Sequence, residues 1–335
     1  MQKARRSRLA VITVREALNQ ALREEMTRDP DVFIMGEDIA VFEGSYKVTA
    51  GLLAEFGERR VIDTPISEEG FVGAGIGAAM VGLRPIIEIM TINFSILAAD
   101  QIVNHAAKMS YMFGGRTRVP IVIRTPGGGG QQLTAQHSQS LEVWYAHIPG
   151  LKVVAPATPA DAKGLLKSSI RDDNPVLFVE NIATYSAKGE VPDGEFLTPI
   201  GVADIKRKGA DISIICHSRM TLVALQAAVQ LEEDGIDCEV VDLRTLRPLD
   251  IETVLGSVRK THRVLTVEEG WRSYGIGAEI TASIAELAFD DLDAPVGRVA
   301  GLEVPMPYSK PLELAVIPDV ERVIQGVKKV LGVDL

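Results

Sequence analysis

The amino-acid sequence predicts an α/β protein built from two tandem doubly wound domains. Strand-like and helical segments alternate along nearly the whole chain, a pattern typical of a parallel sheet with helices on both faces. The alternation breaks once, across Asn181–Pro199, which is rich in glycine, proline and charged residues and has no clear period. A length of 335 residues matches about two domains of ordinary size. We therefore expect a first domain at residues 1–190 and a second at residues 191–335.

The first half begins with a clear helix signal. Thr13 and Glu16 have the spacing of a capping box, apolar residues then recur at helical intervals, and Asp29-Pro30 ends the helix. The remaining elements expected in this half are the strands Val32–Met35, Arg60–Ile62, Pro85–Met90, Val119–Arg124, Lys152–Ala155 and Val176–Val179, and the helices Leu97–Met112 and Pro159–Ile170.

The second half repeats the alternation after the break. Its expected strands are Asp211–Cys216, Cys238–Val241, Arg263–Val267 and Val296–Ala300, and its expected helices are Thr221–Glu233, Ile251–Arg259, Ile276–Leu287 and the amphipathic Val320–Leu331.

Composition excludes several classes of protein. An apolar content of 46% and a charged content of 24% are ordinary for a globular chain, and no window approaches the ~18 apolar residues of a membrane span. The net charge of −10 argues against broad nucleic-acid binding. Cys216 and Cys238 are too few and too far apart for a disulfide scaffold, which favours a reducing compartment: the cytoplasm in a bacterium or an organelle matrix in a eukaryote. The basic residues from Lys3 to Arg8 are interpreted as a short solvated arm.

Three side chains follow predicted strands, where ligands bind in open parallel sheets. Glu37 comes directly after Val32–Met35, although a solvated loop acid is an equal alternative. Glu68 lies at a loop-to-helix junction, where a carboxylate can simply satisfy free N–H groups of the helix. His137 lies beyond a glycine loop, and a lone histidine is more often structural than functional.

The glycine loop Gly127–Gly130 follows Val119–Arg124 and indicates a sharp or mobile turn. It lacks the lysine and hydroxyl residue of a phosphate-binding Walker loop. The second half offers two further candidates, Asp242–Asp250 and Glu268-Glu269-Gly270, in which charged side chains at strand ends are expected to pair with each other. From the residues alone, the chain is a two-domain α/β enzyme or enzyme subunit.

Several motifs together resemble the beta subunits of the decarboxylating component of 2-oxo-acid dehydrogenases. The resemblance covers essentially Val11 to Leu331, and within the family the pyruvate form is the most similar. The segments that carry it are Asp63–Glu68 with Gly70-Phe71, Gly82–Pro85, Ala135–Gln139, Pro149–Val153, Ile170–Pro175, Asp242–Asp250 and Pro305–Glu313.

This resemblance implies a pyrimidine-binding domain followed by a transketolase-type carboxyl-terminal domain, with thiamine diphosphate as cofactor. It implies oxidative decarboxylation of pyruvate and transfer of the acetyl group to a lipoyl-bearing acyltransferase. The chain lacks the GDG…N signature that, in this superfamily, marks the Mg²⁺–diphosphate site. A separate alpha subunit is therefore expected to hold the Mg²⁺ and the diphosphate, in an α2β2 heterotetramer with active sites between chains.

The resemblance also assigns roles to individual residues. Glu68 corresponds to the glutamate that hydrogen-bonds the cofactor's aminopyrimidine ring, and Glu37 to a second acid near that ring. His137 corresponds to the histidine that protonates the lipoyl sulfur during acetyl transfer. Positions around the ring are Ile66, Met90 and Phe94, with Phe94 as the stacking face. Some members of the family bind a structural K⁺, for which the matching positions are Ile121, Ser169, Ile170, Asp172 and Asn174.

Three alternatives stay open on the sequence. The chain could belong to an acetoin or branched-chain 2-oxo-acid enzyme, or to a split transketolase-like enzyme, although no set of sugar-phosphate-binding residues is found. It could also be a non-catalytic scaffold, although Glu68 and His137 argue against that interpretation.

Overall fold

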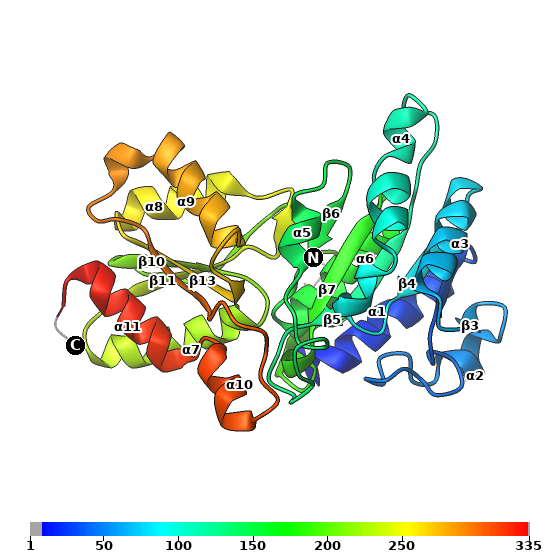
Figure 1. Cartoon of the computed structure of the whole chain (residues 1–335), viewed down its shortest axis with the longest axis horizontal. Helices are drawn as coiled ribbons and strands as arrows, with labels where there is room; N and C mark the ends of the chain where they lie inside the picture. The colour runs from blue at the N-terminus through cyan, green and yellow to red at the C-terminus, as the bar shows by residue number, and fades with distance from the viewer. Residues whose placement is uncertain (1–8, 334–335) are drawn as a thin grey trace, which may run out of the picture.

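The computed structural model describes residues 9–333, and the expected basic arm lies outside them. Two α/β halves stand side by side, the first in blue to green and the second in yellow to red (Figure 1). Among the described residues, no helix combines the length and apolar composition that crossing a bilayer requires.

The first half is built on a seven-stranded sheet in the order β12-β6-β7-β5-β4-β2-β3. Its parallel strands are β2 (Val32–Gly36), β3 (Val61–Asp63), β4 (Arg84–Glu88), β5 (Val122–Gly127), β6 (Lys152–Val154) and β7 (Val176–Asn181). Helices α1 (Val14–Arg28) and α6 (Pro159–Arg171) pack against each other and share one apolar core with the sheet. The other core contains residues of α3 (Glu68–Met80), of the π-helix η2 (Gln101–Ala106) and of α5 (Glu142–Ala146).

The second half is built on a five-stranded sheet in the order β14-β13-β10-β11-β9. Helices α7 (Arg219–Glu233) and α11 (Val320–Leu331) share a core with this sheet, while α8 (Ile251–Thr261) and α9 (Ile276–Leu287) belong to the core that also runs into the first half. The strands are β9 (Asp204–Arg207), β10 (Ile212–Cys216), β11 (Cys238–Asp242), β13 (Val264–Trp271) and β14 (Gly297–Gly301).

Most predicted elements are confirmed. The capping box of α1 forms as expected, because the Glu16 amide donates to Thr13 Oγ1 at 3.2 Å and the Thr13 amide donates to Glu16 Oε2 at 2.7 Å. The expected α/β class with two doubly wound sheets is confirmed as well.

Two expectations of secondary structure are wrong in part. The sheets are not purely parallel, since β9 pairs antiparallel with β11, and β12 (Thr245–Arg247) pairs antiparallel with β6. The single helix expected at Leu97–Met112 is instead η2 followed by the short α4 (Met109–Met112), in a segment where packing on α3 overrides helical propensity.

The expected linker Asn181–Pro199 contains a strand. Within it, β8 (Lys188–Pro192) pairs antiparallel with β1 (Leu9–Thr13) in a separate two-stranded sheet. Local periodicity cannot reveal this strand, because its partner lies at the opposite end of the first half.

Candidate active site

Two buried carboxyl groups lie at the carboxyl edge of the first sheet. Glu37 follows β2 directly, and Glu68 is the first residue of α3, which follows β3. They are only 6% and 4% exposed, and Glu37 Oε1 has no hydrogen-bond partner among the described residues. Because β2 and β3 are parallel neighbours, the fold places both residues at the same edge of the sheet.

The surroundings of Glu37 alter its affinity for a proton. Burial, with repulsion from the carboxylates of Glu68 and Asp38, raises the pKa of Glu37 to about 7. Glu37 can therefore exchange a proton near neutral pH, which an ordinary surface glutamate does not do.

A pH dependence of stability follows from this shift. The folded-state pKa of Glu37 lies above its ordinary value of 4.5, so the folded chain binds the proton more tightly and loses stability as pH rises from about 4.5 to 7. We expect Glu37→Gln to reduce this loss by on the order of 1–3 kcal/mol. Urea unfolding of both proteins at pH 5 and pH 8 measures it. Equal losses in the two proteins would contradict the assignment.

The loops after β4 and β5 complete this edge. Met90 lies in the loop after β4, and Phe94 lies in the 3₁₀-helix η1 (Ile92–Ile96). The His137 ring meets the Phe94 ring edge-on, with centroids 5.3 Å apart and an interplanar angle of 86°. The side chain of Ile66 is 83% exposed, so the structure offers it to a partner or ligand rather than to the core of this chain.

A link between the two loops was not anticipated from the sequence. Asn93 Oδ1 accepts hydrogen bonds from Gln139 Nε2 at 2.8 Å and from the Gln139 amide at 3.3 Å. This contact ties the segment after His137 to the helix that carries Phe94. Asn93 and Gln139 are separated by 46 residues, and no local pattern connects them.

The five residues expected to hold K⁺ do lie near one another, around the end of α6 and the start of β7. Several of their backbone carbonyls accept hydrogen bonds from protein groups. Val176 and Asp172 amides donate to the carbonyls of Ile121 and Ser169, and Arg84 donates to the carbonyl of Ile170.

The Asp172 carboxylate is likewise engaged. It pairs with Lys152 and accepts hydrogen bonds from Asn174, and these contacts lower its pKa against the opposing effect of burial. Two cationic side chains, Lys152 and Arg84, thus contact residues at which K⁺ was expected. None of these contacts tests the K⁺ site itself, which stays a prediction, and we derive no role for that ion.

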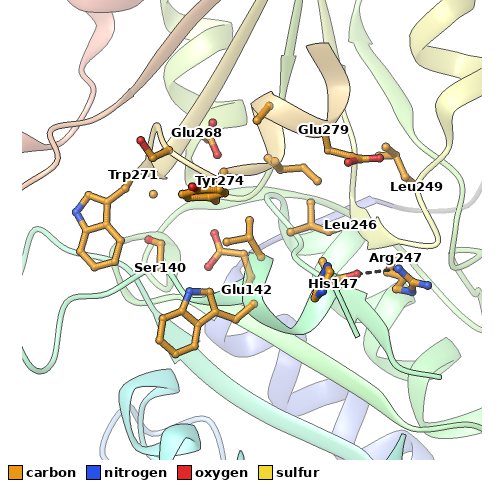
Figure 2. Close-up of a pocket in the computed structure, with 18 of the residues that line it drawn as sticks. Ser140, Glu142, His147, Leu246, Arg247, Leu249, Glu268, Trp271, Tyr274 and Glu279 are labelled. Carbon is orange, nitrogen blue, oxygen red and sulfur yellow. Dashed lines mark hydrogen bonds between the residues drawn. The ribbon is translucent and has the colours of Figure 1, made fainter. Parts of the chain in front are cut away.

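A cavity of about 1190 Å³ lies between the two halves and is lined in part by the two candidate segments of the second half, Asp242–Asp250 and Glu268-Glu269-Gly270. Figure 2 shows Glu142 and His147 on one side and Trp271 and Tyr274 on the other, with Arg247 donating to the carbonyl of Ala146 at 2.9 Å. None of the predicted catalytic or cofactor-binding residues lines it.

Comparison with known proteins decides the family. The family model described as "Transketolase, pyrimidine binding domain" matches residues 10–186, and "Transketolase, C-terminal domain" matches residues 201–323. The pyruvate dehydrogenase E1 component subunit beta of Rhizobium meliloti is 54% identical over 323 residues, covering 96% of this chain and 70% of the relative. The mitochondrial protein of that name from Bos taurus is 53% identical over 327 residues, covering 96% and 91%. The one from Caenorhabditis elegans is 52% identical over 329 residues, covering 97% and 94%.

This chain belongs to the pyruvate dehydrogenase E1 beta-subunit family. The fold agrees with that membership, since a solved structure described as "Split gene transketolase, inactive beta4 tetramer" superposes with a TM-score of 0.80. The match covers 97% of this chain and 99% of the chain in that structure at 24% identity, and it shows a shared fold.

As a member of the E1 beta-subunit family, the chain places its predicted site residues in two groups. Glu37, Glu68, Met90, Phe94 and His137 come from adjacent strand ends at one sheet edge, whereas the residues expected at the K⁺ site form an ion-paired turn.

Proposed function

We propose that this chain is the beta subunit of a thiamine-diphosphate-dependent pyruvate dehydrogenase E1 component. The observation that carries the proposal is the pair Glu37 and Glu68, two buried carboxyl groups at one sheet edge near the exposed Ile66, in a chain more than half identical to several E1 beta subunits. Buried carboxyl groups are costly unless a partner satisfies them, and Glu37 Oε1 has no such partner in the described chain.

The residues present fit an aminopyrimidine ring. Glu68 would hold a ring nitrogen, Glu37 would stand behind it as a second acid, and Ile66, Met90 and Phe94 would supply apolar surface for the faces of the ring. When bound, thiamine diphosphate supplies an electron sink for the electron pair that decarboxylation releases. The task of Glu68 is to hold a proton on the ring-nitrogen side, and the raised pKa of Glu37 keeps a second exchangeable proton beside it.

A partner chain is part of the proposal. The loops that carry the site expose large apolar side chains to solvent: Val41 is 81% exposed, Ile66 83% and Leu97 61%. Exposed apolar surface of this kind marks a protein–protein contact. We propose that an alpha subunit covers it, brings the Mg²⁺ and diphosphate site, and completes an α2β2 tetramer that passes acetyl groups to a lipoyl-bearing acyltransferase.

The proposal that the alpha subunit holds the Mg²⁺ and the diphosphate predicts a binding result. Within residues 9–333, no group of three or more His, Cys, Asp or Glu side chains could hold a metal ion. The chain alone should therefore bind thiamine diphosphate weakly or not at all in the presence of Mg²⁺, and the mixture with an alpha subunit should bind it tightly. Isothermal titration calorimetry compares the two. Tight, Mg²⁺-dependent binding by the chain alone would contradict the proposal.

A panel of substrates tests the activity itself. The reconstituted tetramer should turn over pyruvate faster than acetoin or branched-chain 2-oxo acids. A clear preference for one of these alternatives would replace pyruvate in the proposal and leave the cofactor assignment intact.

For His137→Ala, we expect the two partial reactions to separate. Reductive acetylation of lipoyl domains should fall by about 10²-fold or more, because the proposed role of the ring is to give a proton to the lipoyl sulfur. Decarboxylation measured with an artificial electron acceptor should fall much less. His147→Ala is the matched control, since His147 is exposed and lies on the cavity side of the chain. Equal losses in both assays would count against this role.

A further inference from the structure

We infer that the second half of the chain positions the loop that carries His137, with Glu313 and Glu269 as positioning residues. The consequence for acetyl transfer rests on the proposed function, whereas the positioning itself can be tested without it. Both glutamates lie in segments for which the proposed chemistry gives no role: Pro305–Glu313 and Glu268-Glu269-Gly270.

Glu313 holds the outer part of the glycine loop. It lies in α10 (Lys310–Val316) and is fully buried. Its Oε1 accepts hydrogen bonds from the amides of Gly130 and Gln132, both at 2.9 Å. A carboxylate that accepts from backbone N–H groups forms charge-assisted hydrogen bonds, which are stronger than neutral ones.

Glu269 holds the inner part of the same loop. It lies in β13, and its Oε1 accepts a hydrogen bond from the Gly129 amide at 2.7 Å. Its Oε2 accepts from Asn181 Nδ2 at 2.8 Å, at the end of β7. One carboxylate of the second half therefore bridges two segments of the first half.

Two cationic side chains of the second half bind carbonyl groups of the same loop. Lys310 Nζ donates to the Gly130 carbonyl at 2.6 Å and pairs with Glu313 at 3.2 Å. Arg219 donates to the Gly129 carbonyl at 3.2 Å. The loop backbone is thus bound on its N–H and C=O sides by four charged side chains from the second half.

The fit of the loop against the second half explains its run of glycines. A Cβ on Gly128 would lie 2.4 Å from Asn181 Nδ2 and 2.9 Å from Glu269 Oε1. A Cβ on Gly129 would lie 2.7 Å from Met306 and 2.9 Å from Ile317. The run is therefore a close approach of backbone to these side chains, and the positive φ of Gly128 (84°) and Gly130 (99°) agrees with the sharp turn expected from the sequence.

The held loop leads directly to the histidine. Its base is closed by a hydrogen bond from the Gly128 amide to the Gln139 carbonyl at 3.1 Å, and Gln139 is the residue tied to Asn93 beside Phe94. Between these points, Gln132 and Thr134 adopt left-handed backbone conformations with φ of 55° and 60°. Such conformations persist only where surrounding contacts impose them, so release of the Glu313 end should let His137 shift.

The test uses Glu313→Gln, Glu313→Ala and Glu269→Gln in the reconstituted tetramer, with Glu321→Gln as the control. Glu321 is an exposed glutamate of α11 whose only described contact is with Gln325. Amide hydrogen exchange over residues 128–134 reports on the loop directly. Reductive acetylation of lipoyl domains is then compared with decarboxylation measured with an artificial acceptor.

We expect exchange over residues 128–134 to become about tenfold faster in the Glu313 and Glu269 variants, from loss of charge-assisted bonds. The ratio of reductive acetylation to decarboxylation should fall about tenfold, since a small displacement of a catalytic group is costly. Glu321→Gln should change neither. Unchanged exchange, or equal loss of both reactions, would overturn the inference. A wild-type tetramer inactive on pyruvate would refute the proposed function, and the exchange data would still decide on the positioning.

Discussion

Glu68→Gln should greatly slow decarboxylation while the tetramer still assembles. The glutamine keeps the volume of the side chain and cannot hold or exchange the proton that the proposed mechanism requires. Loss of a general acid–base group costs typically about 10²–10⁴-fold in rate, so we expect a decrease in this range with an artificial electron acceptor. Size-exclusion chromatography or sedimentation should show normal assembly.

The neighbouring residue supplies the control for this experiment. Glu69 has the same chemistry and lies in the same first turn of α3, but its side chain is exposed. Glu69→Gln should keep nearly full turnover. Near-normal turnover of Glu68→Gln, or equal losses in both variants, would exclude the assigned role.

Arg124→Met should strongly lower the free energy of unfolding of this chain. Arg124 lies in β5, is 1% exposed, and pairs with Glu88 of β4 and Glu180 of β7 on either side of it. Glu180 Oε2 also accepts a hydrogen bond from the Tyr185 hydroxyl at 2.5 Å. Removal of the arginine leaves two buried carboxylates without their cation, which costs about 3–5 kcal/mol. Urea unfolding of the chain measures the loss.

Two further variants separate this effect from other causes. Arg118→Met removes an exposed arginine that pairs with Asp173, and such surface pairs contribute only about 0–1 kcal/mol. The triple variant Arg124→Met, Glu88→Gln, Glu180→Gln should regain part of the stability, because it removes the two uncompensated charges. A loss no larger than that of Arg118→Met would show that the buried cation is not needed.

The sequence predicts those parts of the fold that local patterns specify. The capping box at Thr13 and Glu16, the apolar period of α11 and the strand–helix alternation all concern residues near one another in the chain, and the structure confirms them. The strands β8 and β12 escaped prediction because each is stabilised by a partner far away in sequence. Pairing of that kind depends on tertiary context rather than on propensity.

The candidate site divides in the same way. The position of Glu37 and Glu68 at one edge follows from the rule for parallel strands, and the structure places them there. The glycine run could be seen in the sequence, but its contacts with Glu269 and Glu313 span 140 and 183 residues. The K⁺ expectation depended on resemblance alone, and the pairing of Lys152 with Asp172 could not be inferred from it.

The pairing of β12 with β6 affects whether the first half of the chain can be separated from the second. Strand β12 (Thr245–Arg247) forms one edge of the seven-stranded sheet, and all other strands of that sheet end before residue 182. A fragment that ends after the first half would leave backbone N–H and C=O groups of β6 unpaired at that edge. Such groups can pair with a strand of another molecule. The two halves are therefore not independent modules, because the sheet of the first is completed by a strand from the second.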